Sequence, residues 1–416
     1  QELAAISFTF PVTYTVFSLI LGFGIAMSSV LSRQIGEGNQ EKVRRIATHG
    51  LVFSFLFGVV LAISGMFLSA PIFRMMGAGD AMMPLIMDYI WIWFAGSVFI
   101  NMPMVGNAAI RATGDTKVPA LIMTVVAVVN IILDPILIFG LFGFPRMEMQ
   151  GAALATVIAN ACAMFAGLYI LYFHKKLIFQ PGIGVRHFWD SVKRLVFIAV
   201  PVGLTSIIQP ITNAVIIALL ADFGAEAVAA YGVVSRMEAF AFIVIMALAT
   251  GMAPIIGQNW GAALYNRVDE TLRKAIGFAC LWSLLVALVF ILLGRPLAGI
   301  FAEEEAYIDV AVTYFLIVAI TYIPGNLVPG WSSAFNAMGK PQRSFMMIAV
   351  KMFVLQIPLA FLFGHYFGVT GIFCAIATTN VISGIGFHLM NRRICERARA
   401  AASDRDMKLE GQEAVK

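Results

Sequence analysis

Asp134 is the residue of this 416-residue chain whose surroundings point most directly to chemistry. It stands in the segment NIILDP, where Asn130 lies four residues earlier and therefore one helical turn away on the same face. A carboxylate and an amide oxygen at this spacing can share a proton or a hard cation. Pro135 follows and cannot donate to the carbonyl of Ile131, which frees a further oxygen and favours a kink.

Thr156 and Asn160 add two oxygen-bearing side chains in the next apolar stretch, again one helical turn apart. With Asp134 and Asn130 they would place four oxygen-bearing side chains on adjacent helices, a reasonable site for a proton or a hard cation. A structural alternative stays open, in which Asp134 hydrogen-bonds Asn130 and the other two side chains only join helices.

Three other ionisable residues, Arg236, Glu238 and Lys351, fall inside apolar stretches of the second half. Each charge costs about 2.5 to 3.5 kcal/mol in hydrocarbon, so these residues are additional site candidates. Arg236 and Glu238 are two residues apart and point to different sides of a helix, whereas Lys351 could neutralise Glu238. We interpret the three as structural, or as setting the local electric field, with Glu238 as a second proton carrier the alternative.

The composition indicates an integral membrane protein. Hydrophobic residues make up 60% of the chain and charged residues 12%, whereas a soluble domain carries about 25% charged residues. Apolar stretches of about 20 residues, long enough to cross the hydrocarbon layer, recur along the chain. We predict an all-helical fold with about eleven spans, at residues 7–32, 47–70, 84–110, 117–141, 150–174, 194–221, 229–256, 274–294, 310–337, 342–364 and 368–391.

Lys and Arg gather in alternate loops and in the C-terminal tail, and the remaining loops hold only Arg74, Arg146 and Arg295. Because cytoplasmic loops retain positive charge, the C-terminus is predicted to be cytoplasmic. The net charge of +5 follows from this bias and does not indicate nucleic-acid binding. The four cysteines lack metal-ligand spacing, so we expect no metal other than a Na⁺ ion that Asp134 could bind.

An internal repeat relates the two halves at an offset of 225 residues, at which Met27 falls on Met252 and Gly114 on Gly339. The predicted span at 194–221 has no partner in the first half. We therefore expect a parent fold of two parallel six-helix bundles whose first helix is missing here.

The repeat also sets the predicted organisation of the chain. We expect an N-terminal bundle at 1–174, a cytoplasmic linker at 175–193, a C-terminal bundle at 194–391 and a basic cytoplasmic tail at 392–416. The candidate carboxylate is not repeated, because Asp134 falls on Leu359 or Val354, depending on the offset. The shared architecture therefore does not require an acid, which favours a functional site in the N-terminal half.

Four segments resemble the multidrug and toxic compound extrusion (MATE) transporters: MSSVLSRQIGEGN, AAIRATGDTKVP, its counterpart SAFNAMGKPQ, and QGAALATVIAN. NIILDP resembles the prokaryotic DinF-like branch in particular, and the resemblance covers essentially the whole chain. It implies two six-helix bundles flanking a central cleft, in a monomeric multi-pass protein of the bacterial inner membrane that uses no cofactor.

Carried over residue by residue, the resemblance places the family's coupling site at Asn130, Asp134 and Thr156, with Tyr89 nearby. The acid that the family carries in its first helix has no position in this sequence. Gln209 stands where another branch has an acid in the seventh helix.

The resemblance implies export of organic, often cationic and amphipathic compounds in exchange for H⁺ or Na⁺. We expect alternating access, with the halves rocking about the linker region Pro181–Gly184 and Asp134 binding the coupling cation. A flippase for lipid-linked precursors, from the same superfamily, is the alternative. We do not expect an enzyme, because the sequence has no His-Glu metal motif, paired catalytic carboxylates or nucleophile constellation. The expected partners are small drug-like molecules and membrane lipids.

Overall fold

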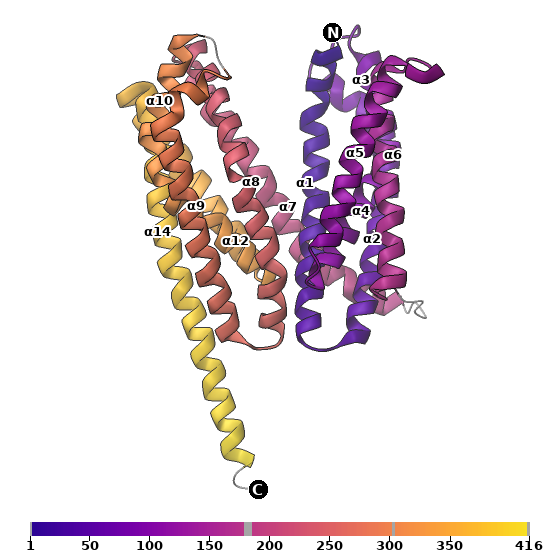
Figure 1. Cartoon of the computed structure of the whole chain (residues 1–416), viewed down its shortest axis with the longest axis vertical. Coiled ribbons are helices and arrows are strands. Elements are labelled where there is room, and N and C mark those ends of the chain that lie inside the picture. Colours follow the sequence, from indigo (N-terminus) through magenta and orange to yellow (C-terminus); the bar gives the residue numbers. More distant parts are fainter. Residues whose placement is uncertain (1, 179–184, 302–303, 414–416) are drawn as a thin grey trace. The chain divides into compact units, whose positions relative to one another are not determined.

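The computed structural model describes residues 2–178, 185–301 and 304–413, and all the regular elements in these ranges are helical (Figure 1). The chain divides into two units, Gln1–Gly203 and Leu204–Lys416. Each unit contains its own clusters of buried apolar side chains.

In the N-terminal unit, α4 packs against α1, α2 and α6. Alanines allow the close approach of α4 and α6, since Ala108, Ala109 and Ala159 are completely buried. The elements of this unit are α1 (Glu2–Gly36), α2 (Gln40–Met75), α3 (Met83–Ala95), α4 (Ser97–Ala112), α5 (Lys117–Phe139), η1 (Leu141–Gly143), α6 (Glu148–Tyr169), the π-helical turn η2 (Ile170–His174) and the first part of α7 (Val185–Ala221).

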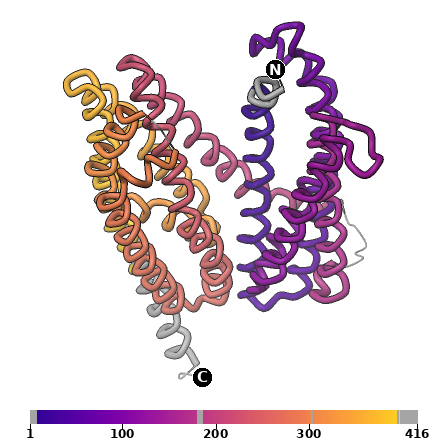
Figure 2. Tube along the Cα trace, turned by 45° about the horizontal axis from the view of Figure 1, so that its top comes forward, coloured from indigo at the N-terminus to yellow at the C-terminus, as the bar shows by residue number. Residues whose placement is uncertain are grey.

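In the C-terminal unit, α8 packs against α9, α10 and α12. The elements are the rest of α7, α8 (Ala225–Gly261), α9 (Tyr265–Ala298), α10 (Glu305–Val318), η3 (Ala319–Thr321), α11 (Tyr322–Gly325), α12 (Leu327–Ala337), α13 (Pro341–Ala349), the π-helical segment η4 (Val350–Gln356) and α14 (Ile357–Glu413). In both views α1 and α2 form an antiparallel hairpin, and so do α8 and α9 (Figures 1 and 2).

Two predicted spans are bent rather than straight. The predicted span 84–110 consists of α3 and α4, which meet at Gly96 with a bend of 47°. Gly96 lies against Val157 of α6, where a Cβ would come within 2.2 Å of Val157 Cγ2. The Ser97 hydroxyl donates to the Gly58 carbonyl at 2.8 Å and so ties the start of α4 to α2. The predicted span 310–337 is likewise interrupted, by the 3₁₀ turn η3.

The predicted repeat reappears in the turns. Left-handed backbone recurs 225 residues apart, at Gly38 and Ala263, Gly114 and Gly339, and Gly143 and Gly368. Alanine at 263 adopts a conformation that favours glycine, so the turn between α8 and α9 keeps the shape of the turn between α1 and α2.

Within the described ranges, nine helices are long and apolar enough to cross a membrane, or ten if α3 and α4 form one span. In this count, residues 341–393 form one helix. Gly368 (φ 63°, ψ −145°) nevertheless interrupts α14 at the boundary predicted between two spans. The count of eleven, and the missing first helix, stay predictions.

The second part of the predicted linker, residues 185–193, is helical and forms the start of α7; its role as a cytoplasmic linker stays a prediction. These residues contain neither proline nor glycine, and Ser191 Oγ lies 3.0 Å from His49 Nδ1 of α2, which anchors the start of α7. The proposed pivot Pro181–Gly184 lies outside the described residues. Beyond residue 392, the predicted tail continues α14 as helix to Glu413.

Candidate functional site

The closely packed pair α5 and α6 carries the predicted site. Gly151 of α6 faces the α5 backbone, where a Cβ would lie 2.7 Å from the carbonyl carbon and oxygen of Leu137. The same Leu137 carbonyl accepts a hydrogen bond from the Met147 N–H at 3.0 Å. Gly140, with φ 71°, ends α5 in the left-handed conformation common at helix C-termini. These contacts fix the register between the two helices.

Asp134 is half-buried on α5, and its carboxylate makes no hydrogen bond or ion pair with any described residue. Pro135 does not end the helix, which continues to Phe139. One turn before Asp134, the Asn130 Oδ1 atom is buried and accepts no hydrogen bond from any described residue. A buried acceptor without a donor costs about 1 to 3 kcal/mol, so this pair is poised to receive a proton or a cation.

The α6 side chains Thr156 and Asn160 both offer oxygen acceptors. The Thr156 hydroxyl donates to the Ala152 carbonyl at 3.1 Å, and the Asn160 amide donates to the Thr156 carbonyl at 2.9 Å. The Thr156 hydroxyl proton and one N–H of the Asn160 amide are thus used within α6, while the Thr156 hydroxyl lone pairs and the Asn160 amide oxygen remain available as acceptors. No hydrogen bond joins Asp134 to Asn130, so the structural alternative, which required one, has no support in this arrangement.

Tyr89 of α3 completes the predicted set. It is half-buried, and it lies within electrostatic range of the Asp134 carboxylate. The adjacent Asp88 is exposed and accepts a hydrogen bond from the Gln150 amide at 2.9 Å. Sequence reasoning missed Gly96, which lies at the bend between α3 and α4 and leaves room for Val157, the neighbour of Thr156 on α6.

In the C-terminal unit, Glu238 of α8 is the centre of a second polar cluster. Its Oε1 atom accepts hydrogen bonds from the hydroxyls of Tyr314, at 2.9 Å, and Tyr322, at 2.7 Å. The two tyrosines stand on either side of η3, the irregular turn that no sequence period indicated. Lys351 is buried and interacts electrostatically with Glu238, but no ion pair shorter than 4.0 Å joins these two described residues. The interaction of Lys351 with Glu238 is thus electrostatic without a direct ion pair, the hydroxyls of Tyr314 and Tyr322 supply the hydrogen bonds to the carboxylate, and neutralisation by Lys351 stays a prediction.

Arg236 and Gln209 are exposed, on α8 and α7 respectively. Neither donates a hydrogen bond to the described Glu238 carboxylate, whose partners are the two tyrosines. Among the described residues no group of three or more His, Cys, Asp or Glu side chains could hold a metal ion.

Outside the membrane-spanning helices, Asp115 joins two segments. Its Oδ2 atom pairs with Lys175 Nζ at 2.7 Å, and its Oδ1 atom accepts from the backbone N–H groups of Lys117 and Val118 at the start of α5. The hydrogen bond from Lys175, followed by that from Val118, lowers the pKa of the Asp115 carboxyl. This side chain both caps α5 and holds the chain that follows α6.

Comparison with known proteins finds a matching family model, similar sequences and similar structures. The family model described as MatE matches residues 1–136 and 201–362. The FAD transporter of Shewanella oneidensis is 35% identical over 404 residues, which are 97% of this chain and 89% of that protein. The multidrug export protein MepA of Staphylococcus aureus is 26% identical over 379 residues, 89% of this chain and 81% of that protein. The crystal structure of the Vibrio cholerae MATE transporter VcmN in the bent form is similar with a TM-score of 0.90 and 27% identity, over 96% of this chain and 90% of that one.

Proposed function

The chain belongs to the MatE family of multi-span membrane transporters, and we propose that it exports an organic solute in exchange for a cation, H⁺ or Na⁺, bound at Asp134. It is not an enzyme. The segment NIILDP supports placement in the DinF-like branch. We also propose the bacterial inner membrane as its location, with a cytoplasmic C-terminus, from the distribution of Lys and Arg.

The observation that carries the proposal is the unpaired set of acceptors on α5 and α6. The Asp134 carboxylate has no hydrogen bond or ion pair among the described residues, and Asn130 Oδ1 is buried without a donor. A proton on Asp134 would supply the missing donor, and Na⁺ would supply the missing positive charge for the same oxygens. Thr156 and Asn160 would complete the oxygen set, and Tyr89 would respond to the charge of Asp134.

Binding of the cation would neutralise a charge in a half-buried membrane position. Charged Asp134 favours a conformation in which water reaches it, and neutral Asp134 favours one in which it is enclosed. Solute affinity that differs between these conformations would couple the two flows by alternating access.

Two solute classes are supported by relatives. Export of drug-like compounds is supported by the relatives named multidrug export protein MepA, at 26% identity. Export of FAD, or of a similar dinucleotide, is a second candidate because the relative named an FAD transporter is 35% identical over nearly the whole chain. Both are small solutes, which favours solute export over the flipping of lipid-linked precursors.

The test uses proteoliposomes with a pH gradient or a Na⁺ gradient imposed separately. We expect one gradient to drive transport of FAD or of a cationic dye such as ethidium. Asp134→Asn should abolish the gradient-driven component while leaving the protein monodisperse. Asp88→Asn, which removes an exposed carboxylate from the same unit, is the matched control and should transport normally. Normal gradient-driven transport by Asp134→Asn would exclude the assigned site.

A further inference from the structure

A cavity of about 400 Å³ lies in the C-terminal unit and shares no residue with the proposed cation site. It opens between α8, α9, α12 and α14, and aromatic and charged side chains line it together. Trp260, Tyr265 and Trp331 supply aromatic walls. The volume falls in the range of about 300 to 1,000 Å³ that small-molecule sites occupy.

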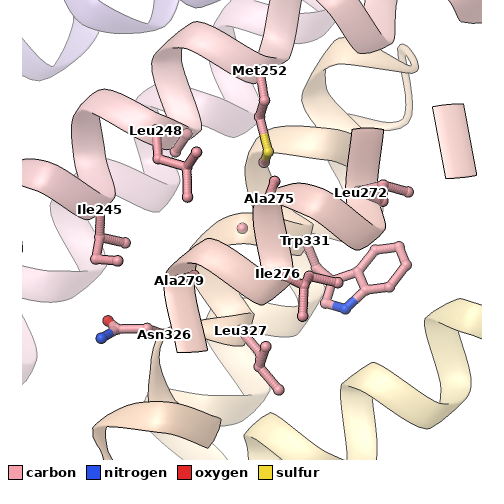
Figure 3. A pocket seen from close by; sticks show the side chains of 12 residues that line it. Ile245, Leu248, Met252, Leu272, Ala275, Ile276, Ala279, Asn326, Leu327 and Trp331 are labelled. Atoms are coloured by element: carbon pink, nitrogen blue, oxygen red, sulfur yellow. The ribbon is translucent and has the colours of Figure 1, made fainter. Parts of the chain in front are cut away.

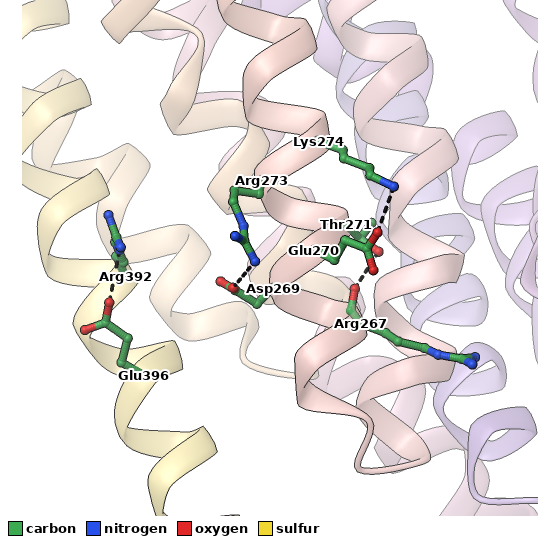
Figure 4. A network of polar contacts seen from close by, with 8 residues as sticks. All are labelled: Arg267, Asp269, Glu270, Thr271, Arg273, Lys274, Arg392 and Glu396. Atoms are coloured by element: carbon green, nitrogen blue, oxygen red, sulfur yellow. Dashed lines mark hydrogen bonds and ion pairs between the residues drawn. The ribbon is translucent and has the colours of Figure 1, made fainter.

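The charged lining consists of two ion pairs on facing helices (Figure 4). On α9, Arg273 pairs with Asp269 at 2.9 Å, and on α14, Arg392 pairs with Glu396 at 3.0 Å. Each pair is exposed and formed within one helix, so it holds its two side chains only weakly. The guanidinium groups and the carboxylates therefore remain available to a ligand that carries both charges.

The cavity also has an apolar side. Leu272, Ile276 and Trp331 line it, and the same three residues line an apolar pocket between α8, α9 and α12 (Figure 3). On α9 the charged side chains Asp269 and Arg273 alternate with the apolar side chains Leu272 and Ile276 within two turns. Charged groups, aromatic rings and apolar side chains gathered in one site are typical of the boundary between membrane and water.

We propose that this cavity binds a phospholipid with an amine-bearing headgroup, phosphatidylethanolamine. The phosphate lies between Arg273 and Arg392, as bidentate contacts of arginine with phosphate favour. The ammonium group meets Asp269 and Glu396. The glycerol and the first acyl carbons contact Trp331, Leu272 and Ile276. The equal number of basic and acidic side chains in the two pairs matches a zwitterion better than an anionic lipid.

The test is native mass spectrometry of the full chain, released from detergent with equal amounts of phosphatidylethanolamine and phosphatidylglycerol. We expect the wild type to retain phosphatidylethanolamine preferentially. The double variant Arg273→Gln, Arg392→Gln should retain it at least about tenfold less strongly, as the loss of charge-assisted hydrogen bonds implies. Asp269→Asn should reduce the preference for phosphatidylethanolamine over phosphatidylglycerol.

Lys274→Gln is the matched control. Lys274 is the neighbour of Arg273 on α9 and pairs with Glu270 at 2.7 Å, but it does not line the cavity (Figure 4). This variant should bind lipid as the wild type does. Equal retention by the double variant and the control would overturn the site, and preferential retention of phosphatidylglycerol by the wild type would overturn the headgroup. Competition by soluble glycerophosphoethanolamine as effective as that by the lipid would overturn the membrane source of the ligand.

Discussion

Gly151→Ala should loosen the α5–α6 pair that carries the proposed cation site. The new Cβ would lie 2.7 Å from the carbonyl carbon of Leu137, so the helices would have to separate by about 0.8 Å to restore a carbon–carbon contact of about 3.5 Å. Overpacking of this kind costs about 1 to 3 kcal/mol. The better helix propensity of alanine offsets only about 0.5 to 1 kcal/mol of this cost. The substitution should therefore lower the free energy of unfolding.

Gly167→Ala is the control for this prediction. Gly167 is buried on the same helix, but a Cβ there would have no neighbour within 4 Å. It should therefore raise thermal stability by the helix-propensity gain alone. We expect thermal unfolding of the purified protein to place Gly151→Ala below the wild type and Gly167→Ala above it. The cation concentration for half-maximal transport should rise only in Gly151→Ala. An equal stabilisation by both substitutions would refute the argument that backbone contact sets this helix pair.

Two further predictions concern polar contacts away from the proposed cation site. Asp115→Asn should lower stability at neutral pH by about 1 kcal/mol, since it weakens an α5 cap and the pair with Lys175. Because the folded-state pKa of Asp115 is lowered, its contribution is present above the unfolded value of about 3.9 and is lost as pH falls through the folded value. Unfolding measured from pH 7 down to 3 should show the wild type and the variant converging at the acid end, and a constant gap would contradict this. Tyr322→Phe should destabilise the C-terminal unit by about 1 to 3 kcal/mol, because Glu238 loses its 2.7 Å donor; an unchanged unfolding temperature would show that Tyr314 alone satisfies the carboxylate.

The sequence predicted the helical class and the pairing of α5 with α6 well, because long apolar stretches and one-turn spacings are local signals. Asp134, Asn130, Thr156 and Asn160 are on the expected helices. The bend at Gly96 was not predicted, and the close contact of Gly96 with Val157, which lies far along the sequence, carries no local signal.

The Glu238 cluster was only half predicted. The carboxylate was visible as a charge in an apolar stretch, but its partners Tyr314 and Tyr322 lie far from it in the sequence and on either side of η3, which no sequence period indicated. The lipid cavity was not predicted at all, since Arg273 and Arg392 are brought together by tertiary packing of α9 and α14. The start of α7 at residue 185 was missed because charged residues 186–194 resemble a loop in composition although they form a helix.

The central claim is that the coupling cation binds at Asp134. Difference infrared spectroscopy of the purified protein, recorded on a change of pH or on addition of Na⁺, reports directly on carboxyl groups that change state. We predict a carboxyl difference band that is present in the wild type and in Asp88→Asn and absent in Asp134→Asn. A band that persists unchanged in Asp134→Asn would contradict the account and place the cation on another carboxylate.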